Sequence, residues 1–279
     1  MNDMVYLTRV GAQNIGDATL QKNVQRRLAH EGFKFTTVAL KDAATWQAFT
    51  HRDIVVSAGG FCCNYRTRPG EFVIYEHLLA RNNRLYFWGP GFNEHAQNVN
   101  SPDYGAPYSM HYDDIFRHPN VVMAGFRDYG NPFEYIPCPS CLDPGFDGPY
   151  QGNEEIVILE HEILELDLPG GERYPKKKQA LQRFAFEDII RFVGGAGTVV
   201  TNTYHGAYWA TLLNKKVVVY KPWSSKFYTL RYKPTFANEV NYREAISSAA
   251  NRSLNFLAEA RATNEDFIGR LKNRLLMSG

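Results

Sequence analysis

Short runs of apolar residues alternate with stretches of helical periodicity along most of the chain. The runs are rich in β-branched and aromatic side chains and are bounded by turn-forming residues, which predicts strands. They lie at residues 4–10, 35–40, 53–57, 85–88, 121–124, 156–159, 198–201 and 217–220. Because these strands are apolar throughout, we expect their sheets to be covered on both faces.

Helical periodicity occupies several of the intervals between the strands. After the first strand, Leu20, Val24 and Leu28 fall on one face of a helix. The same periodicity predicts helices at residues 71–81, 177–193 and 205–213, and a last helix that opens at Thr263. Strands that alternate with helices in this way predict an α/β protein.

Two stretches rich in turn-forming residues interrupt the alternation. Residues 137–152 hold several Pro and Gly residues, and the alternation restarts after them, so we predict a hinge there. This hinge divides the chain into residues 1–150 and residues 151–279, with the terminal helices in the second part. Residues 89–112 are expected to form a long loop at the carboxyl ends of the strands, where such proteins bind ligands.

The composition excludes several classes of protein. Of 279 residues, 44% are hydrophobic and 22% are charged, which is typical of a globular protein. The 31 basic residues nearly balance the 29 acidic ones, so nothing indicates a nucleic-acid partner. No apolar run approaches the ~18 residues of a membrane-spanning helix, and the N-terminus does not resemble a signal peptide. We therefore expect a cytoplasmic protein without a transmembrane segment.

The four cysteines form two close pairs, Cys62-Cys63 and Cys138-x-x-Cys141. Their spacing differs from the paired CxxC motifs of zinc sites, and the sequence contains no other cluster of metal ligands. We therefore predict no metal site. Reduced thiols in a cytoplasmic protein are the simpler interpretation, and the sequence assigns no role to any of the four.

Two glycine-containing turns follow strands of the first half. Asn14-x-Gly16-Asp17 precedes a helix, whose N-terminal N–H groups favour anions, although the spacing is not that of a dinucleotide fingerprint. Asn14 and Asp17 would bind a sugar, with Asp17 as a base for its hydroxyl. Asp17 as the helix N-cap is an equal alternative. Gly59-Gly60 indicates a close approach of the backbone to a ligand or, equally, a tight turn.

Cationic side chains follow two other strands. Arg127-Asp128 comes after residues 121–124, at the edge of the sheet where ligand crevices form. A guanidinium is a natural partner for carboxylate or phosphate, and the alternative is a surface ion pair with Asp128. Lys226 follows residues 217–220 and would bring a second positive charge to the same crevice, or lie solvated on the surface.

The most informative segment runs from Thr201 to Gly206. A strand ends there, and His205 opens the next helix beside Thr203 and Gly206. The helix dipole disfavours the cationic form of such a histidine. The position still suits proton transfer or contact with a phosphate oxygen, so we consider His205 a candidate for chemistry.

In combination, these motifs resemble the polysaccharide pyruvyl transferase family. They occur in the family's order between about residue 8 and about residue 230: Asn14-x-Gly16-Asp17, Gly59-Gly60, Arg127-Asp128, Thr201 to Gly206, and Lys226. The resemblance implies two Rossmann-like lobes in a GT-B-like arrangement, with the site in the cleft between them. It implies an enzyme of exopolysaccharide or capsule biosynthesis that transfers pyruvate from phosphoenolpyruvate to a sugar as a ketal. Phosphoenolpyruvate is then the donor substrate, no further cofactor is needed, and the acceptor is a saccharide, lipid-linked at the inner face of the membrane or free.

The resemblance also implies roles for individual residues. Arg127 and His205 match two donor-binding residues of the family. Thr203 and Tyr204 stand where the family has arginine and leucine, and we predict that they also bind the donor. One expected cation is therefore missing, and Lys226, Arg231 or the helix N-terminus at His205 would have to replace it. We expect Arg127 to clamp the anion, His205 to act as acid or phosphate ligand, and Asp17 to act as base.

Two other functions fit the same residues. One is a GT-B-like glycosyltransferase that uses a nucleotide sugar. The other is a non-catalytic scaffold that binds sugar phosphates, which the threonine at position 203 favours. Consumption of phosphoenolpyruvate, of a nucleotide sugar, or of neither separates the three.

Overall fold

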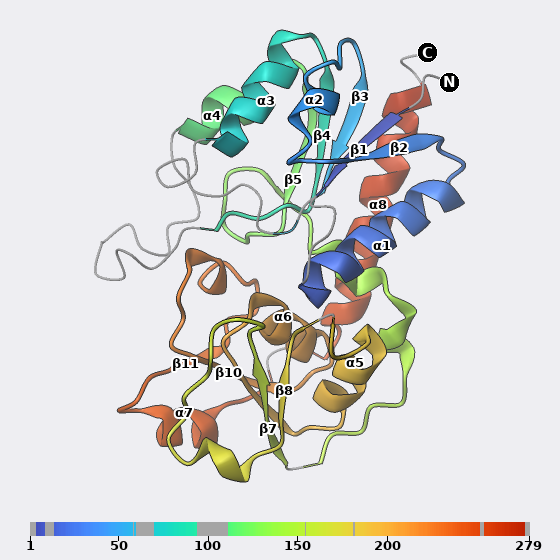
Figure 1. Ribbon diagram of the computed structural model, residues 1–279. Coiled ribbons are helices and arrows are strands. Elements are labelled where there is room, and N and C mark those ends of the chain that lie inside the picture. Colours follow the sequence, from blue (N-terminus) through green and yellow to red (C-terminus); the bar gives the residue numbers. More distant parts are fainter. Residues whose placement is uncertain are drawn as a thin grey trace.

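The chain forms two lobes, each built on a parallel β-sheet (Figure 1). The computed structural model describes residues 4–8, 14–57, 59, 70–93, 111–153, 155–180, 182–251 and 254–276. The first sheet has the strand order β2-β1-β3-β4-β5-β6 and the second β11-β10-β9-β7-β8. Every pairing within the two sheets is parallel, which confirms the predicted α/β class.

The strands are short, and the helices and 3-10 turns connect them. The strands of the first sheet are β1 (Met4–Thr8), β2 (Phe35–Ala39), β3 (Asp53–Val56), β4 (Arg84–Trp88), β5 (Val121–Phe126) and β6 (Glu134–Tyr135), and those of the second are β7 (Ile156–Glu160), β8 (Lys176–Lys178), β9 (Thr198–Thr201), β10 (Lys216–Tyr220) and β11 (Thr235–Ala237). The α-helices are α1 (Ile15–His30), α2 (Ala43–Trp46), α3 (Gly70–Ala80), α4 (His111–Phe116), α5 (Phe186–Gly194), α6 (Tyr204–Leu212), α7 (Tyr242–Ser248) and α8 (Phe256–Leu276). The 3-10 turns are η2 (Pro139–Leu142), η3 (Pro144–Asp147), η4 (Gly171–Arg173) and η5 (Ser225–Phe227).

Alternate residues of the central strands supply two separate cores on the two faces of the first sheet. On β4, Leu85 and Phe87 join one core, and Tyr86 and Trp88 join the other. Helices α3 and α4 cover the first face, and α1 and α8 cover the second (Figure 1). The second core continues into the other lobe, so the two lobes share one body of buried side chains.

Helix α8 follows the second sheet in the chain but crosses back to the first lobe (Figure 1). At its start, Phe256 packs edge-on against Tyr208 of α6, with ring centroids 5.8 Å apart. Further along, Phe267 stacks on Trp88 of β4 at 5.8 Å. Asn264 lies between these contacts, and its Oδ1 accepts a 2.7 Å hydrogen bond from Trp88 Nε1.

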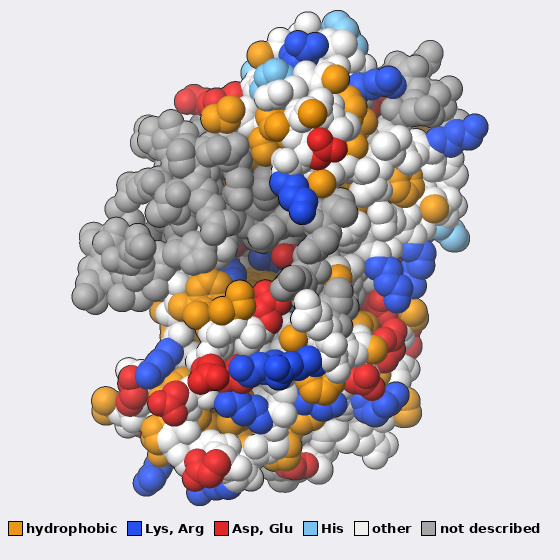
Figure 2. Space-filling view, in the orientation of Figure 1, with side chains coloured by type: hydrophobic (Ala, Val, Ile, Leu, Met, Phe, Trp, Pro, Cys, Tyr) orange, Lys and Arg blue, Asp and Glu red, His pale blue; other side chains and the backbone are white. Residues whose placement is uncertain are grey.

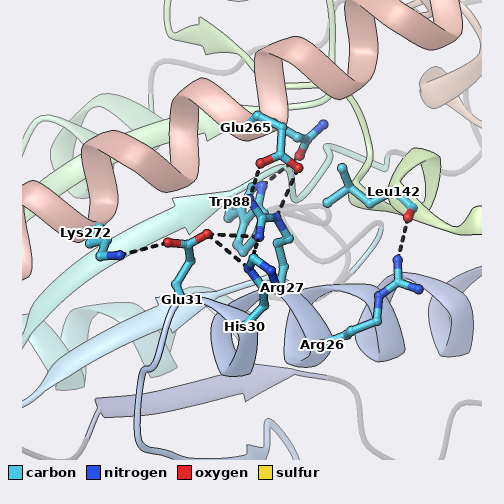
Figure 3. A network of polar contacts seen from close by, with 9 residues as sticks. Arg26, Arg27, His30, Glu31, Trp88, Leu142, Glu265 and Lys272 are labelled. Carbon is cyan, nitrogen blue, oxygen red and sulfur yellow. Dashed lines mark hydrogen bonds and ion pairs between the residues drawn. The ribbon is translucent and has the colours of Figure 1, made fainter.

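Ion pairs line the seam between α1 and α8 (Figure 3). Arg27 binds Glu265 of α8, and Glu31 accepts from Arg27 at 2.9 Å and from Lys272 at 3.0 Å. Pairs of this exposure contribute little stability, about 0–1 kcal/mol each. The apolar contacts beneath them therefore hold α8, and the ion pairs favour its observed position along α1.

The stretch predicted as a hinge connects the two sheets, but it is packed rather than loose. Cys138, Ser140 and Cys141 are fully buried, and η2 lies against both α1 and α8. Arg261 of α8 donates to the backbone oxygen of Cys141 at 3.0 Å. The boundary at residue 150 stays a prediction. Helix α8 follows that boundary in the sequence, yet it covers the first sheet (Figure 1).

Two predicted helices were wrong in extent. Residues 177 and 178 of the predicted helix 177–193 are instead the end of strand β8, and α5 begins only at Phe186. Lys176 and Lys178 of β8 both pair with Glu160 at the end of β7, as the two-residue period of a strand allows. The last helix was predicted to open at Thr263, but it begins at Phe256. Its buried face already includes Phe256 and Ala260, so the apolar stripe starts before the predicted first turn.

The predicted loop at 89–112 lies largely outside the described residues, and α4 begins within its last positions. No helix in the described ranges is both long enough and apolar enough to cross a membrane.

Asn264→Leu should destabilise the protein by about 2–4 kcal/mol, because it leaves buried polar groups unpaired. Trp88 Nε1 would lose its acceptor, and the backbone oxygen of Pro137 would lose a 3.0 Å donor. Asp266→Ala, on the exposed side of α8 at 67% side-chain exposure, should cost no more than about 0.5 kcal/mol. Urea unfolding of both variants measures the difference. Equal losses would contradict a polar anchor at Asn264.

Candidate functional site

The candidate site lies where the carboxyl ends of the two sheets meet. Figure 2 shows the surface hollowed between the two lobes. In the first lobe the N-terminus of α1, Gly59 after β3 and Arg127 after β5 lie at this edge, and in the second the N-terminus of α6 after β9 and η5 after β10. Ligands of open α/β sheets bind at such edges.

The first turn of α1 brings two predicted residues to the site. Asn14 is the N-cap, with its Oδ1 accepting from Gly16 N at 2.8 Å. The alternative role of Asp17 as the cap is therefore wrong. A Cβ on Gly59, which has a φ of +61°, would lie 2.3 Å from Asp17 Oδ1, so the Asp17 carboxylate lies directly against that turn. The neighbouring Gly60 lies outside the described residues.

The first turns of α1 and α6 are in direct contact. A Cβ added to Gly16 would lie 1.9 Å from Nδ1 of His205, so only glycine allows this approach. Each helix N-terminus carries a partial positive charge, and its first-turn N–H groups have no acceptor in the preceding turn of the helix. Their convergence from two lobes creates a place where an anion is favoured.

At the start of α6, Thr203 is the N-cap rather than a free hydroxyl. Its Oγ1 accepts from Gly206 N at 2.8 Å and lies 3.3 Å from Thr201 Oγ1. The Thr203 hydroxyl that was predicted to bind the donor is thus engaged in capping the helix.

The imidazole of His205 is 6% exposed and is surrounded by cations. Burial lowers the pKa of His205 well below its ordinary value, and the positive charges of Arg127 and Lys226 lower it further. Its Nε2 lies 3.7 Å from the sulfur of Cys138, which is also buried. Burial and the nearby cations therefore favour the neutral form of His205 in the chain alone.

Arg127 is buried with two of its donor nitrogens unpartnered among the described residues. It is 3% exposed and lies over the ring of Tyr204, with Cζ 3.9 Å from the ring centroid. In the part of the chain that the structure describes, its Nε and Nη1 make no hydrogen bond. Buried charged donors without acceptors are costly, so this arrangement fits a side chain whose partner is an incoming anion.

Asp128 does not form the surface ion pair that was the alternative for Arg127. It is 1% exposed, and its carboxylate accepts from Phe92 N at 2.8 Å and from Thr229 Oγ1 at 2.5 Å. Burial raises the pKa of Asp128 to about 6, against the opposing influence of Arg127. Asp128 thus fixes the backbone after β4 to the segment after η5, and so holds the lobes together beside the site.

Lys226 is buried near the same crevice. It is 9% exposed, and its Nζ lies 3.8 Å from the centroid of the Trp223 ring. Its charge helps to lower the pKa values of His205 and His161, the latter to about 4 with burial as the larger cause. The solvated-surface alternative for Lys226 is therefore wrong. Arg231 instead pairs with Glu259 of α8 at 3.5 Å.

Several residues of the site could not be recognised from the sequence. Gln179 is fully buried, and neither its Oε1 nor its Nε2 has a hydrogen-bond partner in the described ranges. It directly precedes Ala180, which forms a bridge with Asn14 at the start of α1. The segment was predicted as a helix, so no signal indicated that it ends a strand beside the site. For Cys138 the CxxC spacing was visible, but its place beside His205 depends on the fold.

Among the described ranges, no three His, Cys, Asp or Glu side chains are grouped as ligands of one metal ion. Cys62 and Cys63 lie outside those ranges. The absence of a metal stays a prediction.

Comparison with known proteins supports the fold. No protein-family model matches the chain, and no curated protein matches it. A solved structure of a putative UDP-N-acetylglucosamine 2-epimerase from Listeria monocytogenes is similar, with a TM-score of 0.50 at 9% identity over 93% of this chain and 94% of that one. An uncharacterised protein from Klebsiella pneumoniae superposes with a TM-score of 0.49 at 12% identity, over 79% of this chain and 84% of that one. The first likeness, together with the two parallel sheets, identifies two Rossmann-like lobes in a GT-B-like arrangement.

Gly16→Ala should destabilise the protein by about 1–3 kcal/mol, because the new methyl group overlaps the His205 ring. Gly269→Ala is the matched control, since a Cβ on Gly269 of α8 meets no atom within 4 Å. That control should stabilise by about 0.5–1 kcal/mol through helix propensity. Thermal or urea unfolding compares the two. A stabilised Gly16→Ala protein would mean that α1 and α6 do not meet.

Acid should weaken the fold through His205. Its pKa is depressed in the folded state, so below about pH 6.5 the unfolded chain binds a proton that the folded chain excludes. Stability then falls with falling pH, by up to about 1.4 kcal/mol per pH unit from this one group. The raised pKa of Asp128 has the opposite effect, because below about pH 6 the folded chain binds a proton there more readily than the unfolded chain does. The contribution of His205 is therefore measured by comparing variants with the wild type, and not from the wild-type pH profile alone.

The measurement is urea unfolding at about pH 7.5 and about pH 5.5, either side of the histidine range. His205→Gln should lose less stability on acidification than the wild type. His30→Gln, which alters a histidine whose side chain is 74% exposed, should behave like the wild type. Equal losses in all three proteins would contradict a buried neutral His205.

Proposed function

We propose that this chain is a phosphoenolpyruvate-dependent pyruvyl transferase that forms a pyruvate ketal on a sugar of a cell-surface polysaccharide or its precursor. The observation that carries the proposal is the buried Arg127 guanidinium, which lies near the N-termini of α1 and α6 and whose Nε and Nη1 lack acceptors among the described residues. Such a site suits a small ligand with several negative charges. The family resemblance of the same segments supports phosphoenolpyruvate as that ligand.

Phosphoenolpyruvate has two anionic groups, and the site offers cations for both. Arg127 would bind one group by charge-assisted hydrogen bonds from its Nε–H or Nη1–H, neither of which has an acceptor among the described residues. Lys226, buried in the same crevice, would serve the other and replace the cation lost at Thr203. The N-terminus of α6 adds its N–H groups.

The chemistry needs an acid and a base on the two substrates. Protonation of the donor's methylene carbon makes its neighbouring carbon electrophilic, and a sugar hydroxyl then bonds to that carbon. A second hydroxyl closes the ketal as the carbon–oxygen bond to phosphate breaks. One hydroxyl proton leaves with phosphate, and the other restores the acid. In this proposal Asp17 would receive a hydroxyl proton.

In this proposal His205 gains its catalytic proton only with the donor. Arg127 and Lys226 depress the pKa of His205, and the donor's negative charges would offset them. Donor binding would therefore take up a proton and tighten as the pH falls. Calorimetry in two buffers of different ionisation enthalpy measures this uptake.

A second candidate is a transferase or related enzyme that acts on a nucleotide sugar. The observation that favours it is the likeness of the whole fold to the putative UDP-N-acetylglucosamine 2-epimerase. The decisive assay incubates the protein with a saccharide acceptor and either phosphoenolpyruvate or a UDP-sugar. Phosphate release from the first supports pyruvyl transfer, whereas consumption of the second alone supports this alternative.

Arg127→Met should weaken phosphoenolpyruvate binding about tenfold to a hundredfold, because charge-assisted hydrogen bonds worth about 1.5–3 kcal/mol are lost. Arg127→Lys should restore binding only in part, since an ammonium cannot present donors in the fixed planar geometry of a guanidinium. Arg270→Met, which alters a surface arginine of α8 with 42% side-chain exposure, is the control and should bind normally. Titration calorimetry gives the affinities. Unchanged binding in both Arg127 variants would contradict the proposed clamp.

A further inference from the structure

A second hollow lies at the outer edge of the second sheet, around strand β8. Its volume is about 350 Å³, within the range of small-ligand pockets. In Figure 2 a band of Lys and Arg side chains crosses the second lobe over β8, below the hollow between the lobes. The charged lining consists of Lys176, Lys177, Lys178, Arg183, Glu160 and Glu165. The pocket therefore has an excess of two positive charges.

Part of this charge is balanced within the pocket. Glu160 is fully buried at the end of β7, and its carboxylate lies 3.0 Å from Lys176 Nζ and 3.8 Å from Lys178 Nζ. Lys178 also lies 3.6 Å from Glu165. These two lysines thus neutralise a buried carboxylate.

The other two cations have no carboxylate partner among the described residues. Lys177 lies on the opposite face of β8, with Nζ 4.9 Å from the ring centroid of Phe184 and 5.2 Å from that of Phe192. Arg183 follows the strand, in a turn where its N–H bonds to the backbone oxygen of Ala180 at 3.0 Å. Their charges are available to a ligand.

Lysines on an edge strand can also serve to prevent pairing with another sheet. That function accounts for charges along the strand itself. It does not account for Arg183, which lies beyond the end of β8. It also does not account for a hollow that is lined by Lys177 and Arg183 together with the ring of Phe184.

We infer that this pocket is an anion subsite that binds the diphosphate of the saccharide acceptor. A diphosphate diester carries two negative charges, which match the excess of the lining. The end of β8 leads directly toward the candidate site, because Ala180 bridges to Asn14 at the start of α1. An acceptor anchored here would extend its sugar toward the cleft. The assignment to the acceptor rests on the proposed function, whereas the anion subsite does not.

The test is titration of the full-length protein with inorganic pyrophosphate. Lys177→Gln/Arg183→Gln should weaken binding at least about tenfold, because two charge-assisted contacts are lost. These positions are chosen because neither substitution leaves the buried Glu160 without its partners. Arg173→Gln removes an exposed arginine of the same lobe outside the pocket lining and should bind as the wild type does.

Arg127→Met separates this subsite from the donor site. Pyrophosphate binding at the pocket is the part of the binding that Lys177→Gln/Arg183→Gln removes. This part should persist in Arg127→Met. If the protein binds no phosphoenolpyruvate yet shows this component, the proposed function fails and the anion subsite stands. No pyrophosphate binding to the wild type, or equal binding by the pocket variant, would overturn the subsite.

Two further titrations distinguish the sources of a diphosphate. A short-chain polyprenyl diphosphate that binds at least as tightly as pyrophosphate, with the same loss in the pocket variant, supports a lipid-linked acceptor. UDP could instead bind more tightly than pyrophosphate and the polyprenyl diphosphate, and Phe184→Leu could abolish this additional affinity. That result supports the subsite but overturns its assignment to a lipid-linked acceptor.

Discussion

The contact between Gly16 and His205 is the constraint on which the rest of the site depends. It brings the first turn of a helix from one lobe against the first turn of a helix from the other, with no space for even a methyl group between them. Once these turns meet, the side chains beside them are fixed as well. The buried cations, the cysteine and the carboxylates of the site all lie around this contact.

The electrostatics of the site work against the stability of the isolated chain. Two buried cations and a histidine lie together, and the histidine responds by remaining neutral. The guanidinium of Arg127 is stabilised by the ring of Tyr204 rather than by acceptors for all its N–H groups. Strain of this kind is typical of functional sites, because the missing interactions are those that a ligand supplies.

The sequence contained enough to predict the class of fold and most strands, because strands buried on both faces are apolar throughout. It failed where long-range contacts decide the local structure. Lys177 and Lys178 were predicted to begin a helix, because the sequence does not show that Lys176 and Lys178 both pair with the buried Glu160 of the neighbouring strand. At the site, the positions of Arg127 and His205 after strands were visible, since each lies at a strand end. That Asn14 and Thr203 serve as helix caps depends on hydrogen bonds that residue types alone do not determine.

Helix α8 has a consequence for the order in which the chain can fold. The face of the first sheet that contains Trp88 is completed by residues near the end of the chain, some 180 positions later, where Asn264 and Phe267 meet it. During synthesis the first lobe therefore emerges with an apolar face that no later segment has yet covered. Until α8 leaves the ribosome, that face is available to chaperones or to wrong partners, and a chain that ends before α8 would retain this exposure permanently.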